Sequence, residues 1–192
     1  GHVREATVGE GDKAIAVARS FQPEWDRLRG ARRAGILERA ADLVEANTAE
    51  FMALAAREAG KTPHDTVAEI RETVDFLRYY ALQARQRFEL PTRLPGPTGE
   101  TNELILHGKG VFACISPWNF PLAIFVGQIA AALAAGNSVL AKPARQTPLT
   151  GYHAVCLLHQ AGVPADVLHF LPGSGAAIGA QILPDRRLSG VA

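Results

Sequence analysis

The segment Ile115–Leu122 combines residue types that could stabilise negative charge on a substrate. Prolines on both sides bracket a tryptophan, Asn119 and a phenylalanine, between a β-rich run and an alanine-rich run. Rigid backbone on both sides would fix the Asn119 amide in one direction. A pre-aimed amide N–H stabilises an oxyanion as charge develops on a carbonyl oxygen. The residues alone favour a plainer interpretation, in which Asn119 caps the next helix and Trp118 lies in the core.

Lys142 directly follows the apolar run Ser138–Ala141, which we expect to be a strand of a parallel sheet. Because such sheets bind ligands at the carboxyl ends of their strands, this lysine would lie at the mouth of a crevice. Its cation could reach a ribose hydroxyl or a phosphate there. A solvent-facing lysine after a strand fits the position equally well.

A glycine-rich turn at Leu171–Gly179 follows the next expected strand. Glycines at a strand-to-helix turn allow close backbone approach, and the helix N-terminus attracts phosphate. The strict dinucleotide-binding pattern fails, because Ile178 stands where its third glycine should be. A tight turn, with Gly179 easing helix packing, is at least as good an interpretation.

The elements that would position these residues begin with a helical first half. The pattern predicts a short strand at Val3–Val8 and helices over Asp12–Ser20, Ala31–Ala46, Ala49–Ala59 and Thr62–Leu90. Gly60 would end one helix in the left-handed conformation, and Thr62 would cap the next, with Asp65 at the capping-box position. We expect Arg29, Arg32 and Arg33 to lie on a solvated helix face.

The second half is expected to alternate strands and helices after a loop at Pro91–Gly99. Asn102–His107 and Val111–Ser116 would pair as a hairpin across a glycine-bearing turn. The pattern then predicts helices at Pro121–Ala135, Thr147–Ala161 and Ala176–Leu183, and strands at Ser138–Ala141, Asp166–Leu171 and Arg187–Ala192. This order predicts an α/β fold with a parallel sheet. Residues 1–100 would form a helical part, and 101–192 the hairpin and an incomplete nucleotide-binding sheet.

Composition narrows the class of protein. The 192 residues carry 20 Lys and Arg against 19 Asp and Glu, a net charge of +1 that gives no reason to expect nucleic acid. Phe120–Leu140 is interrupted by polar residues, glycine and proline and makes a poor membrane span. With no leader and only Cys114 and Cys156, we expect a cytoplasmic, reducing setting. The histidines show no metal-ligand spacing, so no metal site is expected.

Several motifs together closely resemble the aldehyde dehydrogenase superfamily. They are Ile115–Leu122, Ala134–Asn137 and Lys142–Pro143. Within it, the chain is most similar to the L-glutamate γ-semialdehyde (pyrroline-5-carboxylate) dehydrogenase module of bifunctional proline utilisation A proteins. The motifs for this subgroup are Arg57–Thr62, Phe76–Tyr80, Leu94–Glu100, Lys142–Ala144 and Gln146–Pro148. The resemblance implies a helical layer, a hairpin and the opening βαβαβ of a Rossmann-type sheet.

The resemblance also implies an activity, namely NAD-dependent oxidation of glutamate γ-semialdehyde to glutamate within a longer chain. In that family a cysteine thiolate attacks the aldehyde, hydride passes to the nicotinamide, and a glutamate-activated water hydrolyses the thioester. Asn119 would be the oxyanion donor. The implied cofactor-binding residues are Ser116, Pro117, Trp118, Lys142, Ala144, Arg145, Gly175 and Gly179.

Two departures from the family pattern matter. The catalytic cysteine and glutamate would lie beyond Ala192, so we expect the 192 residues alone to be inactive. Cys114 and Cys156 lie in apolar elements, where buried small hydrophobes are the better interpretation. Arg145 stands where the family usually has a glutamate that accepts hydrogen bonds from the ribose. An arginine can pair with a 2′-phosphate instead, which suggests tolerance of NADP, although a solvent-facing Arg145 is equally compatible.

Partners follow from the same resemblance. The complete protein would act on a small aldehyde, form a homo-oligomer through its hairpin, and carry FAD only in a proline dehydrogenase domain before residue 1. Two alternatives stay open. The chain could be a non-catalytic nucleotide-binding or assembly module, or it could belong to an aldehyde dehydrogenase with a different substrate.

Overall fold

A computed structural model describes residues 2–192, and its first half is helical as predicted. The helices are α1 (Val8–Arg27), α2 (Gly30–Ala46), α3 (Thr48–Ala59) and α4 (Pro63–Phe88). Gly60 ends α3 with φ of +65°, and the Thr62 hydroxyl caps α4 by accepting from the Asp65 N–H at 3.2 Å. The end of α3 and the start of α4 are therefore both capped, which fixes the position of Lys61 between the two caps.

The expected strand at Val3–Val8 is wrong. Thr7 caps α1, because its hydroxyl accepts from the Glu10 N–H at 3.2 Å and Glu10 accepts from the Thr7 N–H at 2.7 Å. This reciprocal capping box commits the chain to a helix from Val8. Before it, Ala6 makes a single backbone contact, donating its N–H to the Pro172 carbonyl at 2.8 Å.

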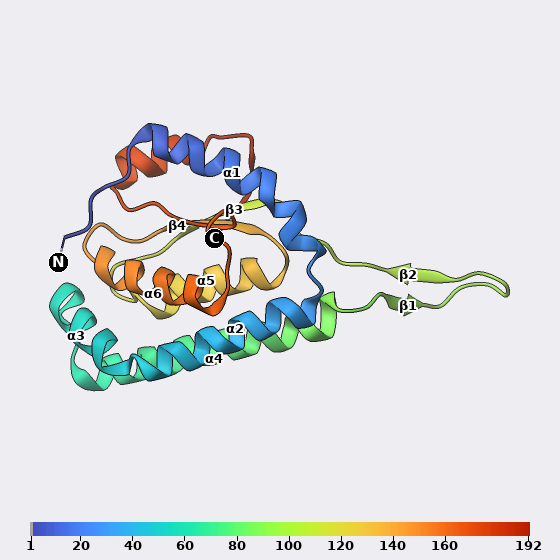
Figure 1. The fold of residues 1–192 in the computed structure, drawn as a ribbon, viewed down its shortest axis with the longest axis horizontal. Coiled ribbons are helices and arrows are strands. Elements are labelled where there is room, and N and C mark those ends of the chain that lie inside the picture. Colours follow the sequence, from blue (N-terminus) through green and yellow to red (C-terminus); the bar gives the residue numbers. More distant parts are fainter. Residues whose placement is uncertain (1) are drawn as a thin grey trace.

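The expected hairpin is paired differently. Strand β1 (Thr92–Leu94), inside the segment predicted to be a loop, pairs antiparallel with β2 (Asn102–Leu104). The two form an arm that extends well away from the body of the molecule (Figure 1). Gly108–Gly110 does not fold into a tight turn, because side chains from the body bind its backbone. Gly108 N–H donates to Asp26 at 2.7 Å, and the next two N–H groups donate to Asn137.

The parallel sheet is confirmed, and it includes the strand that was expected to form the second half of the hairpin. Its strands are β3 (Val111–Ile115), β4 (Ser138–Lys142), β5 (Leu168–Phe170) and β6 (Leu188–Val191), in the order β5-β4-β3-β6. Helices α5 (Ala123–Ala134) and α6 (Pro148–Ala161) connect the first three strands as predicted. The expected helix at Ala176–Leu183 is instead a π-helical turn, η1 (Gly175–Gly179), followed by the short α7 (Ala180–Ile182).

Helices cover both faces of this sheet. Helix α1 lies on one face with α7, and α5 and α6 lie on the other, backed by the α2–α4 pair (Figure 1). In β3, Val111 and Ala113 pack with α1, while Phe112 and Cys114 pack toward α5. Burial on both faces explains why the central strand β3 and the middle of β4 are continuous apolar runs. No helix among residues 2–192 has the length and apolar character needed to cross a membrane.

The direction of the chain across the sheet reverses at β3. From β3 the chain steps outward to β4 and β5, and it then returns to add β6 on the other side of β3. In open α/β sheets, ligands bind at the carboxyl ends of the strands where the order reverses in this way. The segment that leaves β3 therefore lies at the position where the fold itself favours a site.

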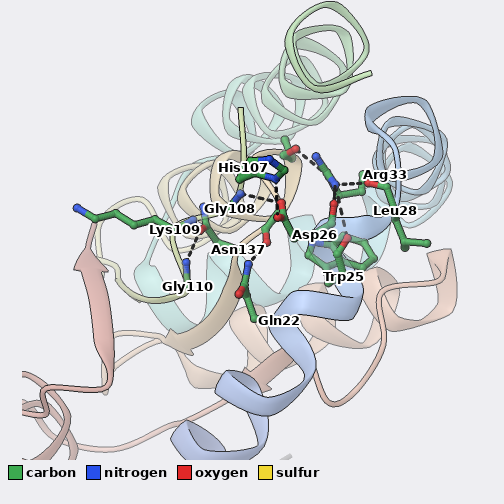
Figure 2. Close-up of polar contacts among 12 residues, drawn as sticks. Gln22, Trp25, Asp26, Leu28, Arg33, His107, Gly108, Lys109, Gly110 and Asn137 are labelled. Atoms are coloured by element: carbon green, nitrogen blue, oxygen red, sulfur yellow. Dashed lines mark hydrogen bonds and ion pairs between the residues drawn. The ribbon is translucent and has the colours of Figure 1, made fainter. Parts of the chain in front are cut away.

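A polar cluster joins the ends of α1 and α5 (Figure 2). The Arg33 side chain donates to the Ala134 and Asp26 carbonyls, both at 3.0 Å, and to the Leu28 carbonyl. Trp25 Nε1 donates to the Leu133 carbonyl at 3.0 Å. The expectation that Arg33 is solvated is wrong, because its residue is only 1% exposed. A guanidinium has five N–H donors, enough to satisfy the carbonyls that both helix ends leave without partners.

Replacing Arg33 with methionine should lower the free energy of unfolding by about 2–4 kcal/mol, since several buried carbonyls would lose a charged donor. Urea denaturation would measure the loss. Arg32→Met is the matched control, because Arg32 is exposed and its replacement should cost less than about 0.5 kcal/mol. Equal losses in the two variants would contradict a structural role for the buried guanidinium.

Candidate functional site

The segment Ser116–Leu122, which we call the elbow, leaves the carboxyl end of β3 beside the end of β4. The Ser116 N–H donates to the Lys142 carbonyl at 3.2 Å, and Ile115 is in register with Lys142. Two residues predicted for the site are thus neighbours across adjacent strands. The elbow and the lysine share the edge of the sheet at which ligands are expected.

The outer part of the elbow faces solvent. Pro117, Trp118, Asn119 and Phe120 are all exposed, and Trp118 is 50% exposed, so the interpretation of Trp118 as core is wrong. Helix α5 starts at Ala123 with Leu122 as its cap residue and without a side-chain cap bond. Asn119 therefore does not cap the helix, which was the plainer interpretation of its position. Its side-chain amide makes none of the hydrogen bonds found among residues 2–192.

Two residues that the sequence analysis missed hold the elbow. Glu69, on α4, accepts from the Leu122 and Ala123 N–H groups at 2.8 and 3.1 Å. Lys61 lies 2.5 Å from the second Glu69 carboxylate oxygen and donates to the Asn119 carbonyl at 3.1 Å. The same ammonium lies 4.4 Å from the centre of the Phe120 ring.

A signal for Glu69 was present in the sequence. The buried stripe of α4 is apolar along most of its length, yet Glu69 lies on it beside Ile70, flanked by Thr66 and Thr73. Acidic residues are almost never fully buried unless they are paired. A glutamate on the buried face of a long helix therefore indicates a partner elsewhere in the fold.

Lys142 and the glycine turn, two of the elements predicted to bind the cofactor, face each other. A Cβ atom built on Gly179 would lie 4.0 Å from the Lys142 Cε. Lys142 is only 5% exposed, which rules out the solvent-facing interpretation, and its ammonium donates to the Pro143 carbonyl at 3.2 Å. Burial lowers the pKa of this lysine. Gly175 has open space where a Cβ would stand, so its backbone is open to close approach by another molecule.

A polar cavity of about 340 Å³ lies beside this turn. Arg145, Glu5, Glu58 and the backbone at Pro172–Gly173 line it. Arg145 is exposed and its Nε lies 3.0 Å from a Glu5 carboxylate oxygen. Ala144, by contrast, is buried, and its carbonyl accepts from the Thr147 N–H at 3.2 Å. The carboxylates of the cavity can accept hydrogen bonds from a ribose, and its guanidinium can bind a phosphate in competition with Glu5.

Glu58 was also missed, and it limits where an anion can bind. It accepts from the Leu149 N–H, the Thr150 N–H and the Thr150 hydroxyl at 2.7–2.8 Å, so a carboxylate already caps the start of α6. The N-terminus of a helix is otherwise a favourable place for a phosphate. Because this helix start is already occupied by a carboxylate, the candidate cations for an anionic ligand beside the glycine turn are Lys142 and Arg145, the latter paired with Glu5.

Cys114 does not have the surroundings of a nucleophile. Cys114 is 0% exposed in the centre of β3, and burial raises the pKa of its thiol to about 12. Cys156 is only half-buried on α6, so the expectation that it is a buried small hydrophobe is wrong. The expectation that Cys114 acts as a small buried hydrophobe is confirmed.

The sequence model of the aldehyde dehydrogenase family matches residues 1–192. The chain belongs to this family. It is 50% identical over 191 residues to the bifunctional protein PutA of Escherichia coli K12, covering 100% of this chain and 14% of PutA. It is 41% identical over 189 residues to the 1-pyrroline-5-carboxylate dehydrogenase of Anoxybacillus flavithermus, covering 97% of this chain and 36% of that enzyme.

Solved structures of the family have the same fold. A variant of proline utilization A from Bradyrhizobium japonicum superimposes with a TM-score of 0.96 at 50% identity, over 98% of this chain and 19% of that one. The 1-pyrroline-5-carboxylate dehydrogenase from Thermus, solved with bound NAD, gives a TM-score of 0.94 at 33% identity, over 97% and 36% of the two chains. The chain thus spans roughly a seventh to a third of the length of the family members it matches.

Cys114 should resist alkylation in the folded protein. Because its thiol is buried and its pKa is near 12, iodoacetamide at pH 8 should leave it unmodified and should react with it fully in urea. Peptide mass spectrometry would measure both. Rapid labelling of Cys114 under native conditions, at a rate similar to that of a free thiol, would show that its surroundings are wrongly described.

Proposed function

We propose that the complete protein containing this chain oxidises L-glutamate γ-semialdehyde to L-glutamate with a nicotinamide cofactor. The observation that carries the proposal is the elbow, which lies where the strand order reverses and presents the Asn119 amide. Within residues 2–192 this side-chain amide makes no hydrogen bond. The choice of aldehyde is supported by similarity to proteins named PutA and 1-pyrroline-5-carboxylate dehydrogenase.

Each part of the site would then have a definite task. The Asn119 amide would donate a hydrogen bond to the aldehyde oxygen as negative charge develops on it. Pro117 and Trp118 would line the path between substrate and cofactor, with Ser116 anchoring the elbow to β4. Bound nicotinamide supplies the acceptor for the hydride that leaves the substrate.

The adenosine end of the cofactor would lie at the neighbouring strand. Lys142 would contact the ribose, and the backbone at Gly175 and Gly179 would lie close to it. Ala144 would place Arg145 at the rim of the cavity. The fit rests on a cation facing a glycine turn and on open space at Gly175.

We further propose that the nucleophile comes from a part of the complete protein outside these 192 residues, because Cys114 is buried with a thiol pKa near 12. On this view the 192-residue chain alone turns over no aldehyde. The β1–β2 arm, with exposed Leu104 and Ile105, would serve oligomer assembly.

The sharpest test of the oxyanion role replaces Asn119 with aspartate in the complete protein. The side chain keeps its shape and loses its N–H donor at neutral pH, so kcat should fall about 100- to 1,000-fold with little change in KM. Formation of reduced nicotinamide, followed by absorbance with glutamate γ-semialdehyde, would measure it. Asn47→Ala, which removes an amide from the turn between α2 and α3, should leave kcat unchanged. Unaltered turnover in the Asn119 variant would contradict the proposal.

Cofactor choice is expected to depend on Arg145 and Glu5. Glu5 pairs with the guanidinium at 3.0 Å and competes with a 2′-phosphate for it. In the complete protein, Arg145→Glu should therefore raise the ratio of kcat/KM for NAD to that for NADP by about tenfold, the effect of one charged hydrogen bond. Glu5→Gln should shift the same ratio toward NADP. An identical ratio in wild type and both variants would show that Arg145 does not contact the cofactor.

A further inference from the structure

We propose that Lys61 and Glu69 are positioning residues for catalysis, which set the orientation of Asn119 through its backbone carbonyl. The inference rests on the proposed function, because it concerns how the oxyanion donor is aimed. Neither residue belongs to the parallel sheet. One lies in the turn between α3 and α4 and the other on α4 itself.

The elbow is fixed at three places. At its start, the Ser116 N–H binds the Lys142 carbonyl of β4. At its end, the Leu122 and Ala123 N–H groups both bind one oxygen of Glu69. In the middle, the Asn119 carbonyl accepts from Lys61. With both ends anchored, this central bond decides how the Asn119–Phe120 peptide plane is rotated.

The contact in the middle is made by a charged group that is itself held in place. Lys61 has a side chain only 11% exposed, and Glu69 one 2% exposed, so the ion pair between them is shielded from water. The ammonium also faces the Phe120 ring at 4.4 Å. A single cation therefore connects α4, the Asn119 backbone and the next side chain of the elbow.

Stability alone is a weak reason for such a pair. Burying two charges costs about as much as their attraction returns, and well-packed apolar residues often replace a buried ion pair at no loss. Geometry is a stronger reason, because a displacement of about 1 Å at a catalytic group can reduce the rate about 100-fold. The pair joins the residue proposed to stabilise the oxyanion to the longest helix of the fold, α4.

The test uses the complete protein with the double substitution Lys61→Met and Glu69→Gln. This variant removes both charges together, so no unpaired charge stays buried, and the glutamine oxygen can still accept from the start of α5. We expect kcat for glutamate γ-semialdehyde to fall about 10- to 100-fold while the Kd for the nicotinamide cofactor stays unchanged. The single variant Lys61→Arg, which keeps the cation and leaves Glu69 unchanged, should retain most of the wild-type kcat.

A double-mutant cycle distinguishes positioning from general damage. In an Asn119→Ala background the Lys61/Glu69 substitutions should reduce kcat less than twofold further, because the group they orient is already absent. Arg39→Met is the control for lost stability. It removes two hydrogen bonds to the Ala161 carbonyl, remote from the elbow, and should lower the melting temperature without changing kcat.

Hydrogen exchange supplies a readout that does not depend on activity. The amides of Leu122 and Ala123 and the peptide across the elbow should exchange faster in the double variant than in wild type. Wild-type kcat in the Lys61/Glu69 variant, or a full additional loss in the Asn119→Ala background, would overturn the inference and leave the proposed function intact. A complete protein with no dehydrogenase activity would overturn both.

Discussion

The N–H groups at the start of α5 have no partner within their own helix, and the Glu69 carboxylate supplies one from a different layer of the fold. This contact determines where α5 begins, and therefore where the elbow ends. The other end of the elbow is fixed separately, because the Ser116 N–H donates to the Lys142 carbonyl of β4 at 3.2 Å. Lys61 makes the arrangement possible, since an unpaired carboxylate at 2% exposure would be very costly. Glu58, on α3, likewise accepts hydrogen bonds from the N–H groups at the start of α6. The helical layer thus supports the sheet through two buried or half-buried carboxylates as well as through apolar packing.

Much of the fold could be predicted because it depends on local signals. The glycine stop at Gly60, the cap at Thr62 and the alternation of apolar strands with helices all act over a few residues. The pairing of β1 with β2 could not be predicted in this way, because it is decided by Asp26 and Asn137, which hold Gly108–Gly110 against the body. Those contacts join residues about 27 to 82 positions apart in the chain. The same reason applies in part to Arg33, whose bond to the Ala134 carbonyl at the end of α5 spans 101 positions.

The candidate site was predicted only in outline. The types of residue at Asn119 and Lys142 suggested their chemistry, and the family resemblance gave them roles. The sequence could not show that Asn119 does not cap α5, or that Glu69 and Lys61 bind backbone groups of the elbow. Nor could it show that Glu58 caps the start of α6. Their effect depends on the packing of α4 against α5 and of α3 against α6, which no local pattern encodes. The signal available in the sequence was Glu69 on the apolar face of α4. It indicated that the carboxylate has a partner but did not identify that partner.

The most direct test of this account is a crystal structure of the complete protein with nicotinamide cofactor and L-glutamate, the proposed product. The account predicts a glutamate side-chain carboxylate oxygen within about 2.7–3.1 Å of the Asn119 amide nitrogen, with the cofactor ribose beside Lys142. It also predicts that the Lys61 ammonium still contacts the Asn119 carbonyl. An Asn119 side chain turned away from the ligand, or a ligand bound at another edge of the sheet, would contradict it.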